Sequence, residues 1–181
     1  ATYVCDTGNI DVIRRFSETI MDLSSGELLE YSNTYNWRQT REEYCDRIYR
    51  KTASLFSTAA ESGAVLSGAP KKIVHALREY GVNIGMAFQI VDDMFDVYGD
   101  SEEIGKPVGN DLLQGVLTLP TIMLVERHPN ENPIEALFQA KDSDRDLERV
   151  LDMIRHSHIQ ADCYQIVRNY CIKAKRALSI L

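Results

Sequence analysis

Apolar residues recur every three or four positions along most of the chain, and no segment shows the strict alternation typical of strands. The first such series follows the break at Gly8-Asn9 and predicts a helix that runs to about Tyr31. Residues 32–36 are polar and predict a loop. Four apolar residues are expected to form the buried face of this helix: Ile13, Phe16, Ile20 and Leu23.

A second helix is predicted to begin at Thr40, because Glu43 stands three residues later and completes a capping box. It should end near Gly68, and Pro70 can then start a third, long helix that ends at about Gly99. The buried face of the second helix is expected to contain Tyr44, Ile48, Leu55 and Ala59. The inward face of the third is expected to contain Ile73, Leu77, Tyr80, Ile84, Phe88, Val91 and Phe95.

The rest of the chain also predicts helices. Residues 100–115 are rich in glycine and predict a loop, after which Thr118 and Pro120 suit a helix start that His128-Pro129 would end. Two further starts are predicted at Asn132-Pro133 and at Ser143, and a last helix from about Ile159 to the C-terminus. The fold class predicted is therefore all-α, an antiparallel helical bundle.

Composition narrows the function classes. The 181 residues suffice for one domain, and a formal net charge of -7 argues against a nucleic-acid groove but not against a small anionic substrate. No apolar run approaches the roughly 18 residues of an integral membrane segment. The four cysteines form no Cys-x-x-Cys pair, which predicts reduced, mostly buried thiols in a cytoplasmic protein and no zinc site.

Three aspartates near the end of the third helix are candidate metal ligands. Asp92 and Asp96 are one helical turn apart and share a face, and Asp93 is rotated by roughly 100° from Asp92. Their neighbours are apolar, so unpaired carboxylates there would be costly. Mg²⁺ would resolve this conflict, because it takes oxygen ligands and commonly joins a few carboxylates to substrate phosphates. A solvated acidic helix rim is the alternative that this motif leaves open by itself.

Two lysines are candidates to bind an anionic substrate. Lys51 lies on or beside the apolar stripe of the second helix, where its stem could also simply extend to solvent. Thr52 adds a hydroxyl next to that cation, a combination suited to phosphate oxygens. Lys106 stands in a glycine-containing segment, residues 105–111, which is no Walker motif and by itself indicates a surface turn.

Taken together, these segments resemble those of the trans-isoprenyl (polyprenyl) diphosphate synthases. The matching segments occur in the family's order: residues 26–29 (GELL), 51–53 (KTA), 85–96 (GMAFQIVDDMFD), 105–112 (GKPVGNDL) and 118–120 (TLP). The resemblance covers essentially the whole chain and implies a helical bundle of the isoprenoid (terpenoid) synthase type. Residues 1–181 would then be the C-terminal part of a single domain whose N-terminal helices are missing.

The resemblance implies a prenyltransferase that condenses isopentenyl diphosphate with an allylic diphosphate, with Mg²⁺ as cofactor. The implied metal ligands are Asp92, Asp93 and Asp96. The implied catalytic residues are Lys51, Thr52, Gln89 and Asp92, and the implied substrate-binding residues are Lys51, Thr52, Phe88, Gln89 and Lys106. A homodimer is also implied by the resemblance.

Two departures from the family pattern matter. The family's first aspartate-rich motif is not found in residues 1–181, so we expect this polypeptide alone to be inactive and its product length to be unreadable from its sequence. Val116 stands where many relatives carry Lys, which puts one diphosphate contact in doubt. A non-catalytic helical partner subunit of a heteromeric prenyl synthase is one alternative, and the intact second aspartate-rich motif, Asp92 to Asp96, argues against it. A terpene cyclase is another, but residues 51–53 and the segment that begins at Gly105 fit chain elongation better.

Overall fold

The structure is a computed structural model that describes residues 2–99, 108–130, 132–139 and 143–181. All regular structure in these ranges is helical, which confirms the predicted all-α class. None of the described helices is both long enough and apolar enough to span a bilayer. The chain divides into two compact units: Ala1–Leu29, Asp46–Gln89 and Arg168–Leu181 form the first, and Glu30–Cys45 and Ile90–Val167 form the second.

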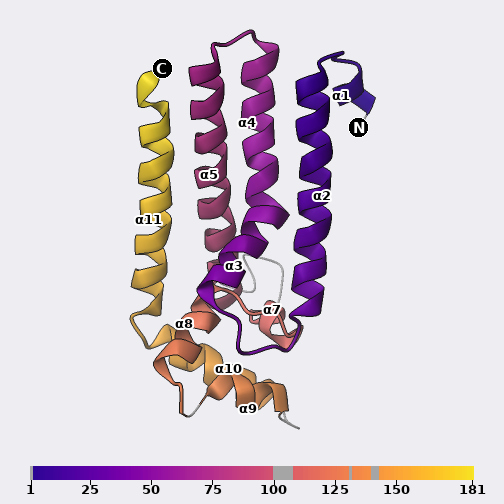
Figure 1. The fold of residues 1–181 in the computed structure, drawn as a ribbon. Helices are drawn as coiled ribbons and strands as arrows, with labels where there is room; N and C mark the ends of the chain where they lie inside the picture. Colours follow the sequence, from indigo (N-terminus) through magenta and orange to yellow (C-terminus); the bar gives the residue numbers. More distant parts are fainter. Residues whose placement is uncertain (1, 100–107, 131, 140–142) are drawn as a thin grey trace. The chain divides into compact units, whose positions relative to one another are not determined.

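The first unit is built mainly from long helices (Figure 1). Figure 1 shows α4 and α5 as neighbouring helices joined by a short connection at Gly68, which has the left-handed φ of 74° that suits a helix end. The elements that lie wholly or partly in this unit are α1 (Thr2–Cys5), α2 (Ile10–Ser32), α3 (Arg41–Ile48), η1 (Tyr49–Ala53), α4 (Ser54–Leu66), α5 (Lys71–Tyr98), α11 (Ile159–Ala177) and η2 (Leu178–Ile180).

Small residues mark the closest contacts between these helices. A Cβ placed on Gly81 of α5 would come 2.6 Å from the carbonyl oxygen of Phe56 in α4. The hydroxyls of Thr19 in α2 and Thr58 in α4 lie 2.5 Å apart and are buried. Helix α2 therefore buries Val12, Thr19 and Gly26 rather than its largest apolar residues. The predicted buried face of α2 is wrong for Ile20, which is 46% exposed.

The second predicted helix contains an unexpected π-helical turn, η1 (Tyr49–Ala53). Tyr44 and Ile48, before η1, are buried as expected, but Leu55 and Ala59, after it, are exposed. A π-turn accommodates an extra residue, so every later residue is rotated relative to the α-helical pattern. Beyond η1 the buried residues are instead Ser54, Ser57, Thr58 and Ala64.

Helix α5 also differs from its predicted face. Phe88 and Phe95 are 55% and 54% exposed, so their predicted inward orientation is wrong. The face of α5 that packs against η1 contains Gly85. A Cβ on Gly85 would come 2.6 Å from the Cα of Ala53, so this face has no room for a large side chain. Buried apolar residues of this helix include Ala76, Met86, Ala87, Ile90, Met94 and Val97.

The second unit consists mostly of short helices. They are α7 (Asn110–Leu113), α8 (Leu119–Arg127), α9 (Pro133–Gln139) and α10 (Ser143–Arg155), and α10 packs against the other three. Parts of α3, α5 and α11 belong to this unit as well. Its core contains large apolar residues that are at most 1% exposed: Leu117, Ile122, Leu124, Ile134, Val150, Ile154 and Ile159.

The predicted helix starts in the second unit are confirmed by their caps. Thr40 and Glu43 bond reciprocally, with distances of 2.7 Å from the Thr40 N–H to the Glu43 carboxylate and 3.2 Å from the Glu43 N–H to the Thr40 hydroxyl. Thr118 begins α8 with a second capping box. Asn132 accepts the N–H of Ile134 at 2.9 Å at the start of α9. These caps satisfy backbone donors that a helix start leaves without partners.

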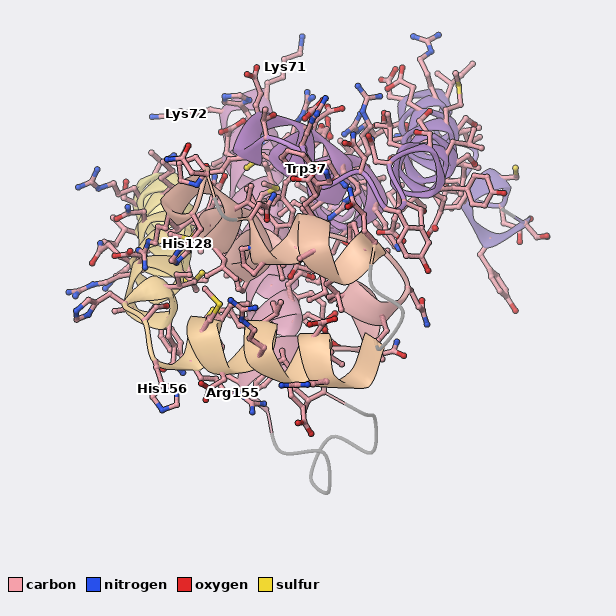
Figure 2. The ribbon with its side chains drawn as sticks, turned by 90° about the horizontal axis from the view of Figure 1, so that it is seen from below. Trp37, Lys71, Lys72, His128, Arg155 and His156 are labelled. Atoms are coloured by element: carbon pink, nitrogen blue, oxygen red, sulfur yellow. The ribbon has the colours of Figure 1, made fainter. Side chains whose placement is uncertain are left out.

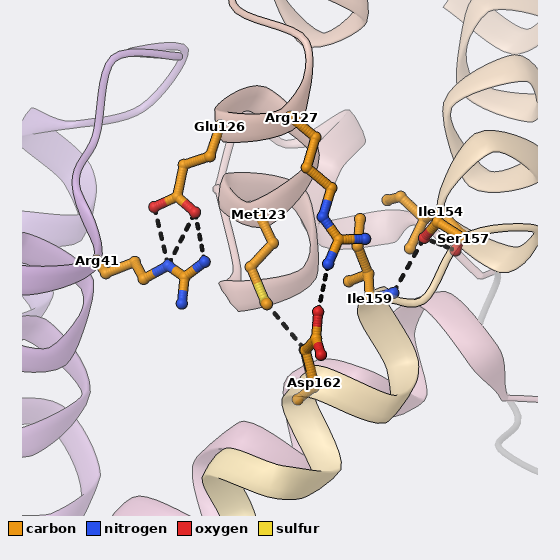
Figure 3. A network of polar contacts seen from close by, with 9 residues as sticks. Arg41, Met123, Glu126, Arg127, Ile154, Ser157, Ile159 and Asp162 are labelled. Carbon is orange, nitrogen blue, oxygen red and sulfur yellow. Dashed lines mark hydrogen bonds and ion pairs between the residues drawn. The ribbon is translucent and has the colours of Figure 1, made fainter.

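Side chains from α8 and α10 tie this unit together. Arg155, labelled at the end of α10 in Figure 2, donates a hydrogen bond from Nε to the carbonyl oxygen of Val97 at 3.0 Å and so caps the C-terminal end of α5. Figure 3 shows two ion pairs on α8, one between Glu126 and Arg41 of α3 and one between Arg127 and Asp162 of α11. All four cysteines are free thiols, as predicted, but the expectation that they are mostly buried is wrong, because only Cys163 is buried.

Candidate functional site

In the first unit, the structure brings together two of the predicted reaction-centre residues. Thr52 lies on η1 and Gln89 lies on α5, and the Thr52 hydroxyl donates a hydrogen bond to the Gln89 amide oxygen at 2.6 Å. The bond is part-buried and spans 37 positions of sequence. The close approach of Gly85 to Ala53 allows this contact, because it brings the backbones of α5 and η1 together one turn away from Gln89.

Lys51 precedes Thr52 on η1. Its ammonium lies 3.4 Å from a carboxylate oxygen of Glu27, and the two side chains are 34% and 62% exposed. Such an exposed pair contributes little stability, so this contact by itself orients Lys51 only loosely. Gly26, adjacent to Glu27, allows the approach, because a Cβ there would come 2.7 Å from the Lys51 backbone nitrogen.

Phe88 was predicted to bind substrate and lies in the same unit. It is more than half exposed and packs against Phe56 of α4, with ring centroids 5.3 Å apart and planes inclined by 39°. This arrangement leaves one side of the Phe88 ring accessible, next to Gln89 in sequence. Its role in substrate binding stays a prediction.

In the second unit, the three aspartates at the end of α5 occupy different environments. Asp92 is exposed, whereas Asp93 is only 5% exposed. Asp93 accepts a hydrogen bond through Oδ2 from the hydroxyl of Tyr44 at 2.6 Å, and Tyr44 is completely buried. The sequence analysis placed Tyr44 correctly in the interior but did not assign this contact, since nothing in the local pattern pairs residues 49 positions apart.

Asp96, the third aspartate, accepts hydrogen bonds from residues 109–111. Its carboxylate oxygens accept the backbone N–H groups of Asn110 at 3.1 Å and Asp111 at 3.3 Å, and its carbonyl oxygen accepts the N–H of Gly109 at 2.6 Å. Gly109 has a φ of 79°, and a Cβ on it would also come 2.9 Å from Leu147 of α10. Asp96 therefore fixes the start of α7 against the end of α5.

The ionisation of Asp96 is strongly affected by these surroundings. Burial raises the pKa of Asp96 to about 7, and the nearby carboxylate of Asp111 raises it as well. The two backbone N–H groups act in the opposite direction, and Asp93 raises the pKa by a smaller amount. A cation next to Asp96 would relieve the repulsion among these carboxylates and favour the ionised form.

The remaining predicted site residues are not placed together by the structure. Lys106 lies outside the described residues. Lys51, Thr52 and Gln89 belong to the first unit and the aspartates to the second, so their convergence on one diphosphate stays a prediction. Within the described ranges no three His, Cys, Asp or Glu side chains are grouped closely enough to hold a metal ion. Val116 is half-buried, and its N–H donates to the carbonyl oxygen of Asp111 at 2.8 Å.

Comparison with known proteins identifies the family of this chain. A family described as polyprenyl synthetase matches residues 1–154. A protein named prenyl transferase from Synechocystis is 34% identical over 99% of this chain and 55% of its own length. The chain belongs to the polyprenyl synthetase family. A second relative of this family, heptaprenyl diphosphate synthase component 2 of Bacillus subtilis, is 35% identical over 93% of this chain and 48% of its own length.

Solved structures of polyprenyl synthetase relatives have the same fold. The heptaprenyl diphosphate synthase of Staphylococcus aureus superposes with a TM-score of 0.90 at 35% identity, covering 96% of this chain and 54% of its own. A polyprenyl synthase of Caulobacter crescentus, crystallised with calcium and isoprenyl diphosphate, also gives 0.90 at 29% identity, over 97% of this chain and 55% of its own. The chain thus spans about half the length of the relatives it matches.

Proposed function

We propose that the chain forms part of a prenyltransferase that condenses isopentenyl diphosphate with an allylic diphosphate to give a longer trans-polyprenyl diphosphate. The observation that carries this proposal is the hydrogen bond between Thr52 and Gln89. It joins the two segments, residues 51–53 and 85–96, whose motifs most specifically resemble the family. The isoprenyl diphosphate in the Caulobacter relative supports the substrate class.

In the proposed reaction, the bond between the allylic carbon and the diphosphate oxygen breaks first. Diphosphate leaves with the electron pair, and Lys51, whose ammonium is only loosely held by Glu27, is placed to bind its oxygens. The double bond of isopentenyl diphosphate then attacks the allylic cation and forms the new carbon–carbon bond. The departed diphosphate accepts one proton, and the electrons of the broken C–H bond form the new double bond. The isopentenyl unit makes the product five carbons longer.

Thr52 and Gln89 have a different role in this scheme. Because the Thr52 hydroxyl donates to the Gln89 amide oxygen, the dipoles of these two groups are fixed relative to each other. Preorganised dipoles of this kind stabilise charge that develops during a reaction without having to reorganise. We assign to this pair the stabilisation of the allylic cation.

The residues at the end of α5 fit a Mg²⁺ ion shared with diphosphate. Asp92 presents an exposed carboxylate, and the pKa of Asp96 is raised first by burial and then by repulsion from nearby carboxylates, which a divalent cation would relieve. Mg²⁺ usually takes one or two protein carboxylates together with water and phosphate oxygens, so a group of three protein ligands is not required. Asp92 and Asp96 would hold the ion, and when bound it would supply positive charge to the leaving diphosphate. Ligation by Asp93 remains a further prediction.

A homodimer is the assembly that we propose. Three large apolar residues on α2 share one face and are 68–70% exposed: Ile10, Met21 and Leu28. These separate apolar side chains would be covered if a second copy of the chain packed on this face of α2. Association with a different chain is the alternative, since relatives from Bacillus subtilis and Geobacillus stearothermophilus are named component 2 of a heptaprenyl diphosphate synthase. Sedimentation of the purified chain alone would give a dimer mass in the first case and a monomer mass in the second.

The proposed function is tested in two steps. The chain should bind inorganic pyrophosphate in the presence of Mg²⁺, measured by isothermal titration calorimetry, and Lys51→Ala should weaken this binding. Labelled isopentenyl diphosphate should enter a longer product only when the chain is part of a complete synthase, because residues 1–181 lack the first aspartate-rich motif. Unaltered pyrophosphate binding in Lys51→Ala would contradict the assignment of Lys51.

A further inference from the structure

Tyr44 is completely buried, and its hydroxyl donates a hydrogen bond to Asp93. It lies in the first turn of α3, where its N–H donates to the carbonyl oxygen of Thr40 at 3.0 Å. The capping box between Thr40 and Glu43 fixes this turn. The ring is therefore held by the backbone on one side and by core packing on the other, which leaves its hydroxyl little freedom.

The partner of this hydroxyl is the carboxylate of Asp93. The distance of 2.6 Å between Tyr44 Oη and Asp93 Oδ2 lies in the short range that O–H groups adopt when they donate to carboxylates. Hydrogen bonds to a charged group are about twice as strong as those between neutral groups. A buried carboxylate needs hydrogen-bond donors, and the Tyr44 hydroxyl supplies one of them to Asp93.

Anchoring Asp93 also determines where its neighbours point. Successive residues of a helix are rotated by roughly 100°, so a carboxylate fixed inside at position 93 turns position 92 outward, and Asp92 is indeed exposed. Asp96 lies one turn after Asp92. Arg155 holds the same end of α5 through the carbonyl oxygen of Val97 and limits its movement.

We infer that Tyr44 is a positioning residue for the acidic motif: by holding the carboxylate of Asp93 in the interior, it presents Asp92 and Asp96 to the cation bound with diphosphate. This inference rests on the proposed function. It assigns no contact with substrate to Tyr44. Residues that orient carboxylate ligands by hydrogen bonding typically change metal affinity by roughly 10–100-fold when they are replaced.

The test removes single hydroxyl groups. Tyr44→Phe keeps the ring and deletes the donor, and Tyr35→Phe is the matched control, because the Tyr35 hydroxyl also donates a hydrogen bond in the second unit, to the carbonyl oxygen of Leu113 at 3.2 Å. The probe is Mn²⁺ with excess inorganic pyrophosphate, and electron paramagnetic resonance measures the dissociation constant of Mn²⁺ from the chain. The measurement is made well below the unfolding temperature of every variant. Tyr44→Phe should raise this constant by about tenfold, whereas Tyr35→Phe should leave it unchanged.

A purely structural role is separated from positioning by a double-mutant cycle. In the background Asp93→Leu, which removes the acceptor, Tyr44→Phe should have no further effect on the Mn²⁺ dissociation constant. An unchanged constant in Tyr44→Phe, with only a lower unfolding temperature, would overturn the inference, as would an equal effect of Tyr44→Phe in both backgrounds. If the unsubstituted chain binds no Mn²⁺ with pyrophosphate, the proposed function itself fails and the inference fails with it.

Discussion

Gly26 of α2 lies against the backbone of Lys51, so closely that a Cβ on residue 26 would come 2.7 Å from the Lys51 nitrogen and 3.0 Å from its Cα. Both distances are shorter than atoms in contact allow, and the obstructing atoms are backbone rather than a flexible side chain. The contact therefore sets how closely η1 can approach α2. It also places Lys51 within 3.4 Å of the carboxylate of Glu27.

The first prediction concerns this contact. Gly26→Ala should destabilise the chain by about 1–3 kcal/mol, because the added methyl group must displace the backbone of η1. Urea unfolding followed by circular dichroism measures the effect. Gly63→Ala is the control, since Gly63 is also in a helix but has no atom within 4 Å of the added Cβ, and it should stabilise by about 0.5–1 kcal/mol. Equal effects of the two substitutions would contradict the close packing described for Gly26.

The second prediction concerns Thr52. Thr52→Val keeps the shape of the side chain but removes the donor to the Gln89 amide oxygen, so the Gln89 side-chain amide signals in a ¹⁵N spectrum should shift. In a complete synthase that contains this chain, turnover should fall by about 10²-fold if the pair stabilises the allylic cation. Thr52→Ser retains the hydroxyl and should retain most of the turnover. A loss in Thr52→Ser as large as that in Thr52→Val would indicate that the methyl group, and not the hydroxyl, matters.

The fold class and most helix boundaries could be predicted from the sequence because their signals are local. Caps such as Thr40, Thr118 and Asn132 act within three residues, and the structure contains each of them. The buried faces were predicted less well. The apolar pattern identifies Ile20 and Phe88 as core residues, whereas the closest helix contacts in fact use Gly26 and other small residues, and larger side chains lie at the flanks.

The π-helical turn η1 explains a further error. A periodicity of 3.6 residues carries no sign of one extra residue at Tyr49–Ala53, so Leu55 was placed on the wrong face. Within the candidate site, the residue types and their order could be recognised from the motifs, and the resemblance implied a catalytic role for both Thr52 and Gln89. The contact of Tyr44 with Asp93 could not, because it depends on how α3 and α5 pack and not on spacing.

The third prediction separates stability from cation binding at Asp92. Because Asp92 is exposed, Asp92→Ala should change the free energy of unfolding by no more than about 0.5 kcal/mol. Binding of Mn²⁺ with pyrophosphate should weaken by about tenfold or more, since a direct carboxylate ligand is lost. Glu79→Ala removes another exposed carboxylate from α5 and serves as the control. Similar binding by the two variants would indicate that Asp92 is part of a solvated rim only.

The fourth prediction concerns pH and Asp96. The pKa of this carboxyl group is about 7 in the folded chain, mainly because of burial, against an ordinary value of 3.8. Between these values the folded chain holds a proton that the unfolded chain has lost, so stability must fall as the pH rises through this window and level off above pH 7. The unfolding temperature of the metal-free chain should therefore be lower at pH 8 than at pH 5.

Asp96→Asn provides the control for this dependence, because the amide cannot ionise but can still accept an N–H group from Asn110 or Asp111. The variant should lose this part of the pH dependence and be the more stable of the two at pH 8. Mg²⁺ should raise the unfolding temperature of the unsubstituted chain at pH 8, where a cation favours the ionised carboxylate, and should do so far less in Asp96→Asn. A pH profile that is the same in both chains would show that Asp96 is already ionised well below pH 7 and that the repulsion from Asp111 is relieved in another way.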